Sequence, residues 1–153
     1  ELLKYIVNDK KCPVIYICID KPCSTIKKLM EKENIDPKIV VFIDVVTLMS
    51  RVEAKESNCI YISGPENLTD VCIALSETIN SLSGNKPYII IDSLSTLLVY
   101  NKSDSVVKFA HIFTAKTKQY GAKGLVISAK KSSDDQFVSQ VFQFFDDSID
   151  LGG

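Results

Sequence analysis

Short apolar segments alternate with stretches of helical period along the chain. Six of these segments, rich in Val, Ile and Tyr, are candidate strands: residues 14–19, 39–43, 59–63, 88–91, 124–128 and 148–151. Most of them lack the polar and apolar alternation of a half-exposed strand, as expected of strands that helices cover on both faces. The pattern predicts β-α units, and therefore an α/β fold with three layers and a mainly parallel central sheet.

The segments between the candidate strands carry apolar residues at spacings of three and four, which is typical of amphipathic helices. The clearest stripe consists of Leu68, Val71, Cys72, Leu75, Ile79 and Leu82. Asn67 stands where a helix cap is expected, and Gly84 is a plausible stop. We therefore predict a helix between these two residues.

Weaker stripes predict further helices. One runs from Val106 to Tyr120 and ends at Gly121, and a shorter one contains Ile26 and Met30. The shorter helix should stop before Pro37, because proline disfavours helical geometry in the preceding residue. Two more are expected over residues 137–145 and 2–7, whereas residues 44–58 show no clean period and predict a loop with a short helix.

Composition and charge narrow the class of protein. The chain has 153 residues, 46% of them hydrophobic and 24% charged, and no long linker or repeat, which indicates one globular domain over residues 1–153. A net charge of −1 argues against nucleic acid as a partner. The longest apolar runs are too short to cross a bilayer, so no membrane partner is expected. Arg51 is the only arginine, and we interpret it as a solvated charge.

Cysteine usage indicates a reducing compartment, the cytoplasm. The five cysteines are an odd number, and they form neither a C-x-x-C pair nor a zinc pattern with histidine. Cys18, Cys59 and Cys72 fall among apolar positions, so we interpret them as small buried hydrophobic residues.

Three candidate strands end in aspartate, at Asp20, Asp44 and Asp92. If these strands are parallel, the carboxylates gather at the carboxyl edge of the sheet, where open α/β folds bind ligands. Such oxygen ligands suit magnesium, although aspartate also favours turns after strands, and both interpretations stay open for Asp20 and Asp44. Asp92 differs because hydroxyl residues follow it: Ser93, Ser95 and Thr96.

The sequence lacks a recognisable phosphate-binding loop. Its six glycines form neither G-x-x-x-x-G-K-[ST] nor G-x-G-x-x-G. The turn "SGPEN" is a single strand-to-helix connection, and "YGAKG" joins a helix to a strand at the opposite edge of the sheet. His111 is the only histidine, and no G-x-S-x-G nucleophile pattern accompanies it, so we interpret it as a boundary residue.

A receiver-like signalling domain is one alternative. Asp92, Ser128, Lys130 and Lys131 would approach one edge of the sheet, which is the acid, hydroxyl and lysine layout of such domains. Receivers, however, need an acidic pair after the first strand and a phosphoacceptor after the third, whereas Asp92 ends the fourth candidate strand.

Taken in order, "VIYICIDKPCSTIKKLMEKENIDPKIVVFID", "YIIIDSLSTLLVYN", the helix to Tyr120 and "GAKGLVIS" resemble the core of KaiC-like and RecA-superfamily ATPases of archaeal type. The resemblance extends from the first candidate strand to "DDSIDL". It implies a RecA-like P-loop NTPase topology without the P-loop segment. A Walker A loop would precede the helix to which "ELLKYIVNDK" corresponds.

The resemblance also implies roles for individual residues. It places Asp92 at the Walker B position, where the carboxylate supports the magnesium of bound ATP, with Ser93 and Thr96 as further candidate nucleotide-binding residues. The family carries catalytic glutamates after the strand that precedes "PCSTI", and this sequence has Asp20 and Lys21 there. Asp20 is therefore the candidate catalytic residue, while Lys21 replaces an acid that would serve as a general base.

Two functional hypotheses follow from the resemblance. The first is a non-hydrolysing regulatory or protein-interaction module that has lost the phosphate loop and acts through a protein partner or through self-association. The second is a fragment of an active ATPase whose Walker A loop lies upstream, with ATP and magnesium as its cofactors. Glu1 in place of an initiator methionine motivates the second hypothesis.

Overall fold

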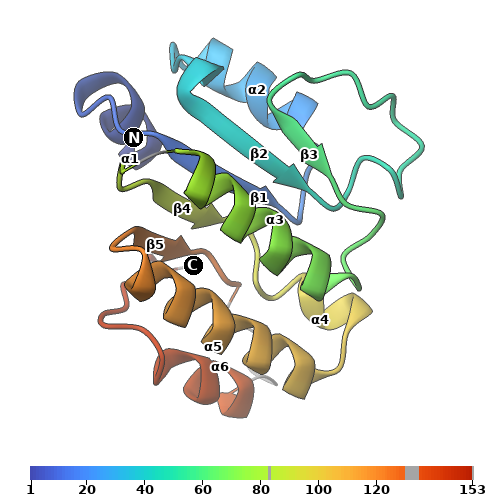
Figure 1. Cartoon of the computed structure of the whole chain (residues 1–153). Coiled ribbons are helices and arrows are strands. Elements are labelled where there is room, and N and C mark those ends of the chain that lie inside the picture. Colours follow the sequence, from blue (N-terminus) through green and yellow to red (C-terminus); the bar gives the residue numbers. More distant parts are fainter. Residues whose placement is uncertain (83, 130–134, 153) are drawn as a thin grey trace.

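The computed structural model describes residues 1–82, 84–129 and 135–152 and contains a five-stranded parallel sheet (Figure 1). The strands are β1 (Val14–Cys18), β2 (Val40–Asp44), β3 (Cys59–Tyr61), β4 (Tyr88–Ile91) and β5 (Lys123–Val126). Their order across the sheet is β3-β2-β1-β4-β5. Five predicted strands are therefore confirmed, but the prediction of a sixth at residues 148–151 is wrong, because these residues form no strand.

Helices connect the strands. They are α1 (Leu2–Lys4), which continues as the π-helix η1 (Tyr5–Asp9), α2 (Cys23–Lys32), the 3-10 helix η2 (Pro37–Ile39), α3 (Leu68–Ser81), α4 (Leu97–Tyr100), α5 (Ser103–Gln119) and α6 (Asp135–Phe142). Each helix predicted from a periodic stripe is present, with ends shifted by a few residues. The short α4 is an addition that the sequence pattern did not predict.

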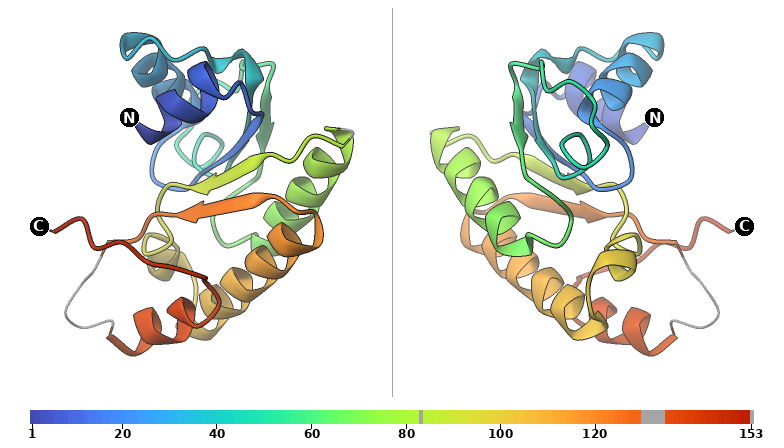
Figure 2. Two further views of the ribbon diagram at one scale, coloured as in Figure 1. Left: turned by 90° about the vertical axis from the view of Figure 1, so that its left-hand side faces the viewer. Right: turned by 90° about the vertical axis from the view of Figure 1, so that its right-hand side faces the viewer.

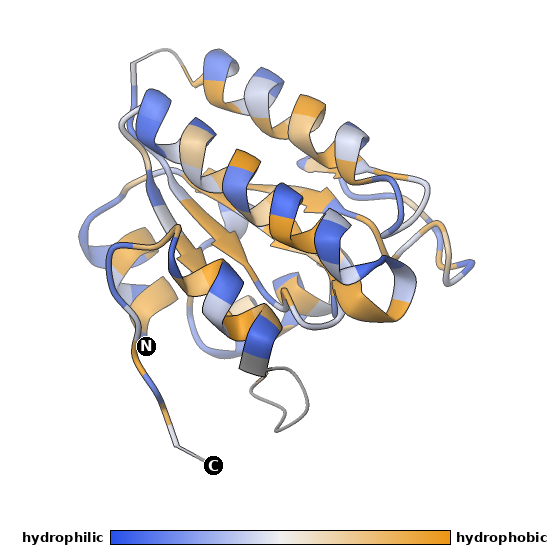
Figure 3. Ribbon diagram, turned by 90° about the horizontal axis from the view of Figure 1, so that it is seen from below, coloured by the Kyte–Doolittle hydropathy of each residue, from blue (hydrophilic) through white to orange (hydrophobic). Residues whose placement is uncertain are grey.

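The helices cover both faces of the sheet, and this arrangement gives the fold three layers (Figure 2). Successive side chains of a strand point to opposite faces. In β1, Ile15 and Ile17 belong to the core beneath α3 and α5, whereas Val14, Tyr16 and Cys18 belong to the core beneath η1 and α2. Because both faces are buried, the strand is apolar throughout, and Figure 3 shows strongly hydrophobic strands between mixed helices.

The residues predicted to begin or end helices are confirmed in some cases and not in others. Gly121 has a positive φ of 63° where α5 ends, as predicted. Pro37 begins η2, and the Asp36 carboxylate accepts a 3.0 Å hydrogen bond from the Lys38 N–H there. Asn67 does precede α3, but its side chain makes no capping bond and donates instead to the hydroxyl of Ser63 at 2.9 Å. The predicted capping role of Asn67 is therefore wrong.

The segment between β2 and β3 is a connection without a helix. Residues 47–51 form turns, and residues 52–56 run without regular structure. Arg51 lies at the end of the turns with an exposed side chain and a φ of 55°, as expected of a solvated charge. Among the residues described above, no helix is long and apolar enough to cross a membrane.

Candidate functional site

A cavity of about 420 Å³ opens at the carboxyl ends of β1, β4 and β5. Its lining consists of Asp20, Asp92, Ser93, Ser95, Thr96, Val99, Ile127, Ser128 and Ala129. Because neighbouring strands run parallel, the residues that follow them meet at one edge of the sheet. The predicted candidates Asp20, Asp92, Ser93 and Thr96 therefore share one cavity.

Asp92 anchors the floor of this cavity. Its Oδ1 atom accepts hydrogen bonds from the backbone N–H groups of Ile19 at 2.8 Å and Asp20 at 3.2 Å. Its Oδ2 atom is buried and has no hydrogen-bond partner among the residues that the structure describes. Burial raises the pKa of Asp92 to about 6, because desolvation disfavours the charged carboxylate. An unpaired buried carboxylate oxygen is costly, and either a water molecule or a cation would satisfy it.

The hydroxyl groups after Asp92 form a small network. Ser93 Oγ lies 2.6 Å from Thr96 Oγ1 and 3.4 Å from Ser95 Oγ. Ser95 Oγ also accepts a 3.0 Å hydrogen bond from the N–H of Ala129, which follows β5. This network joins the segment after β4 to the segment after β5 and shapes the mouth of the cavity.

Asp20 lies at the rim of the cavity, next to a cation. The Lys21 Nζ atom is 3.8 Å from Asp20 Oδ2, and both side chains are about half exposed. A pair this exposed contributes little to stability because water and salt screen it. The lysine nevertheless places a positive charge beside the carboxylate of Asp20 at the rim.

The donor set of the cavity fits a magnesium ion better than it fits phosphate. Carboxylate and hydroxyl oxygens are the hard ligands that magnesium takes, and Asp92 Oδ2 has no other partner among the described residues. Phosphate groups need free N–H donors or cationic side chains, and no lysine or arginine is among the described lining residues. Asp92, with Ser93 or Thr96 beside it, would hold the ion.

Asp44 does not join this group, contrary to the expectation that all three strand-ending acids gather. Its carboxylate is buried and accepts four hydrogen bonds, from the N–H groups of Cys23, Val46 and Thr47 and from the Thr47 hydroxyl, at 2.6–2.8 Å. Both oxygens are thus satisfied. Of the two interpretations left open for Asp44, the turn-forming one holds, and Asp44 fastens the starts of α2 and of the β2–β3 connection.

The remaining residues that the sequence singled out are the cysteines, the histidine and the residues of the receiver hypothesis. Cys18 is buried, whereas Cys59 and Cys72 are only partly buried. His111 is exposed, and its ring stacks on Phe144 with centroids 4.6 Å apart, which fits a boundary residue. Ser128 lines the cavity. Lys130 and Lys131, which the receiver hypothesis requires, lie outside the described residues.

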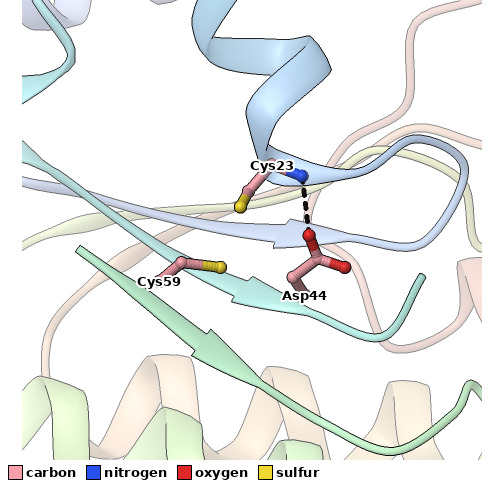
Figure 4. A group of neighbouring side chains, drawn as sticks. All are labelled: Cys23, Asp44 and Cys59. Carbon is pink, nitrogen blue, oxygen red and sulfur yellow. Dashed lines mark hydrogen bonds between the residues drawn. The ribbon is translucent and has the colours of Figure 1, made fainter. Parts of the chain in front are cut away.

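The sequence did not predict one group of neighbouring side chains. The thiols of Cys23 and Cys59 and the carboxylate of Asp44 have ligand atoms within 4.8 Å of one another (Figure 4). Cys23 begins α2 and Cys59 begins β3, so no short spacing in the sequence connects them. The repeated strand-plus-aspartate pattern placed Asp44 correctly at the end of β2, but nothing in the pattern indicated these neighbours.

The chain shares its fold with a KaiC-like protein and with an uncharacterized protein, both solved from Pyrococcus horikoshii. The KaiC-like protein PH0186 superimposes with a TM-score of 0.59 at 9% identity, over 83% of this chain and 52% of its own. The uncharacterized protein PH0321, solved in complex with an unknown peptide, superimposes with a TM-score of 0.67 at 14% identity, over 95% of this chain and 68% of its own. This chain thus spans about half the length of PH0186.

Family membership rests on residues 20–151, which match the model of the family of unknown function DUF7504. The match covers most of the chain, and the protein belongs to this family. Among curated proteins, none matches the sequence.

Proposed function

We propose that the chain is a single RecA-like and KaiC-like regulatory domain, which holds a divalent cation at Asp92 and does not hydrolyse ATP by itself. The observation that carries the proposal is the chemistry of the cavity. It offers carboxylate and hydroxyl oxygens, and its described lining contains no cationic side chain. The described lining therefore provides the part of a nucleotide site that faces magnesium, and it contains no cationic side chain to face phosphate.

The surroundings of Asp20 support the absence of hydrolysis. A general base must be free to accept a proton from the attacking water. Asp20 instead lies 3.8 Å from the ammonium group of Lys21, which stands where the family resemblance implies a second acid. Magnesium bound at Asp92 would supply charge neutralisation for a polyanionic ligand, while Asp92 and its neighbouring hydroxyls would position the ion.

We place the action of the domain in protein contacts, with a partner or with a second copy. The sheet supports this proposal because β3 and β5 form its two edges, and neither has a second neighbour among the described strands. Open strand edges accept an additional strand from another chain. PH0321, of the same fold, was solved with an unknown peptide, and we extend peptide or protein binding to this chain. The odd number of cysteines supports a cytoplasmic location for this activity.

One observation favours a second function, ATP hydrolysis with a phosphate-binding loop supplied from outside this sequence. Asp92 keeps a buried Oδ2 atom without a partner among the described residues, as a Walker B carboxylate would. A loop provided by another segment or another chain would complete that site.

Phosphate release separates the two functions. The purified chain is incubated with ATP and magnesium beside Asp92→Asn and beside Asp70→Asn, which changes an acid on α3 away from the cavity. We expect all three proteins to release phosphate at the background rate of buffer. Turnover by the native chain and by Asp70→Asn that Asp92→Asn abolishes would contradict the proposal and establish the second function.

The oligomeric state tests the contact hypothesis. Size-exclusion chromatography with light scattering at several protein concentrations would report self-association as a rise in mass. A dimer would assign the contact to a second copy. A monomer at every concentration would leave a separate protein as the partner.

A further inference from the structure

The thiols of Cys23 and Cys59 lie on the side of the sheet that carries α2, apart from the Asp92 cavity. Their sulfur atoms lie within 4.8 Å of each other, and Figure 4 shows them beside Asp44. Cys23 is the first residue of α2, and Cys59 is the first residue of the edge strand β3. From the geometry we infer that Cys23 and Cys59 are a redox pair that hydrogen peroxide converts to a disulfide and that a cellular thiol converts back.

The two thiols are chemically unequal, which suits such a pair. A hydrogen bond with Cys59 lowers the pKa of the Cys23 thiol, and a hydrogen bond with the Tyr61 hydroxyl, 3.7 Å away, acts in the same direction against burial and Asp44. The same contact with Cys23 raises the pKa of Cys59. Cys23 is therefore the thiolate that attacks, and Cys59 is the protonated partner that follows.

Tyr61 helps to hold the thiols of Cys23 and Cys59 close together. Its hydroxyl oxygen accepts a 3.0 Å hydrogen bond from the N–H of Glu56, in the connection before β3. The Glu56 carboxylate in turn pairs with Lys27, on the first turns of α2. These contacts keep the start of β3 beside the start of α2, so the two sulfur atoms need only a small approach to bond.

The reaction is balanced with hydrogen peroxide as the oxidant. The Cys23 sulfur bonds to one peroxide oxygen, the O–O bond breaks, and the departing hydroxide takes up the proton that Cys23 released, forming water. The Cys59 sulfur then bonds to the Cys23 sulfur, the S–O bond breaks, and hydroxide leaves with the Cys59 proton as a second water. Two thiols lose two electrons, and the peroxide gains them.

A metal ion fits the same group less well. A third ligand would have to be Asp44, but four donors already occupy its two oxygens. Structural zinc sites require four ligands, and the described residues near these thiols offer no further cysteine, histidine or acid to the group. A disulfide is uncharged and leaves the hydrogen bonds of Asp44 intact.

Access limits the oxidant to a small molecule. Cys23 is 1% exposed, whereas Cys59 is partly exposed on the edge strand β3. Peroxide is close to water in size and can enter beside β3. Since Cys23 follows Lys21 by two positions, the disulfide would also fix the turn that carries Asp20 at the rim of the cavity.

Peptide mapping tests the pair. The reduced full chain is treated with hydrogen peroxide, alkylated, unfolded and cut before aspartate residues, which separates Cys23 (residues 20–35) from Cys59 (residues 44–69) and from Cys12 and Cys18 (residues 9–19). We expect fragments 20–35 and 44–69 to be joined, and dithiothreitol to release them. Cys72→Ser should keep the cross-link, while Cys23→Ser and Cys59→Ala should lose it.

A chemical trap gives an independent result. In Cys59→Ser, which keeps a hydroxyl donor beside Cys23 but has no sulfur to bond, the reaction should stop at a sulfenic acid on Cys23, which dimedone labels. The inference is overturned if fragments 20–35 and 44–69 stay separate while Cys12 is oxidised, if other cysteines form the cross-link, or if the purified chain retains zinc that protects both thiols.

Discussion

The Oδ1 atom of Asp92 accepts a 2.8 Å hydrogen bond from the backbone N–H of Ile19, and so joins the end of β4 to the end of β1. This bond fixes the orientation of the carboxylate and leaves Oδ2 buried and without a partner among the described residues. Oδ1 thus holds the carboxylate in place, while the described residues leave Oδ2 available to a ligand. That division of roles is what makes Asp92 the centre of the candidate site.

Asp92→Asn should stabilise the folded chain at neutral pH. Burial raises the pKa of Asp92 to about 6, so above pH 6 the folded state carries an ionised carboxylate that the unfolded state solvates better. The free energy of unfolding should rise by about 1–3 kcal/mol in the variant. The gain should shrink as the pH falls from 6 toward 4, because the folded native carboxyl then binds a proton. Urea titrations of the native chain and the variant at pH 7 and at pH 4 measure the difference in the free energy of unfolding. An equal difference at the two pH values would contradict the burial argument.

Asp44→Asn should destabilise the chain although Asp44 lies outside the cavity. An amide group cannot accept all four hydrogen bonds, and its NH₂ group would face N–H and O–H donors. We expect the free energy of unfolding to fall by about 2–4 kcal/mol. Thr47→Val, which removes one of the four bonds, should lose about 1 kcal/mol. A loss below about 0.5 kcal/mol for Asp44→Asn, the range of ordinary surface changes, would refute the structural role.

Phe113→Ala tests the core beneath α5. Phe113 is 1% exposed and packs in the cluster between α5 and the sheet, so its truncation should leave a cavity and lower the free energy of unfolding by about 3–5 kcal/mol. Phe142→Ala is the matched control, because that ring is 51% exposed. Similar losses in the two variants by chemical denaturation would mean that this part of the core is misplaced.

Lys21→Ala should strengthen cation binding at the cavity. The lysine ammonium lies 3.8 Å from Asp20 Oδ2 at the rim, and its removal leaves a more negative mouth. Because both groups are half exposed and screened, we expect a gain in affinity of about two- to fivefold, which should disappear at high salt. Lys28→Ala, an exposed lysine on α2, serves as the control. Calorimetric titration that finds equal effects for both lysines would exclude a local role for Lys21.

The order of elements could be predicted from the sequence because both faces of the sheet are buried. Apolar runs without alternation marked β1 to β5, and helical stripes marked α2, α3, α5 and α6. The run at residues 148–151 misled the prediction, because a short apolar sequence becomes a strand only when a neighbour pairs with it. The four residues of α4 were missed because one helical turn leaves no periodic stripe.

The candidate site could be predicted in part. Parallel strands bring residues after β1 and β4 to one edge, and this rule was enough to place Asp20 near Asp92. The structural role of Asp44 could not be predicted, because it depends on hydrogen-bond donors from Cys23 and Thr47. The packing of α2 against β2 brings Cys23 into reach. The meeting of Cys23 with Cys59 depended on the same packing.

Titration with Mn²⁺, followed by the electron paramagnetic resonance signal of the free ion, tests the central claim most directly. Mn²⁺ takes the same oxygen ligands as magnesium and reports binding without any nucleotide. The account predicts that the native chain and Asp70→Asn bind one ion per chain, and that Asp92→Asn, though folded and more stable, loses that binding. Binding that Asp92→Asn leaves unchanged, or no binding by the native chain at millimolar ion, would contradict it.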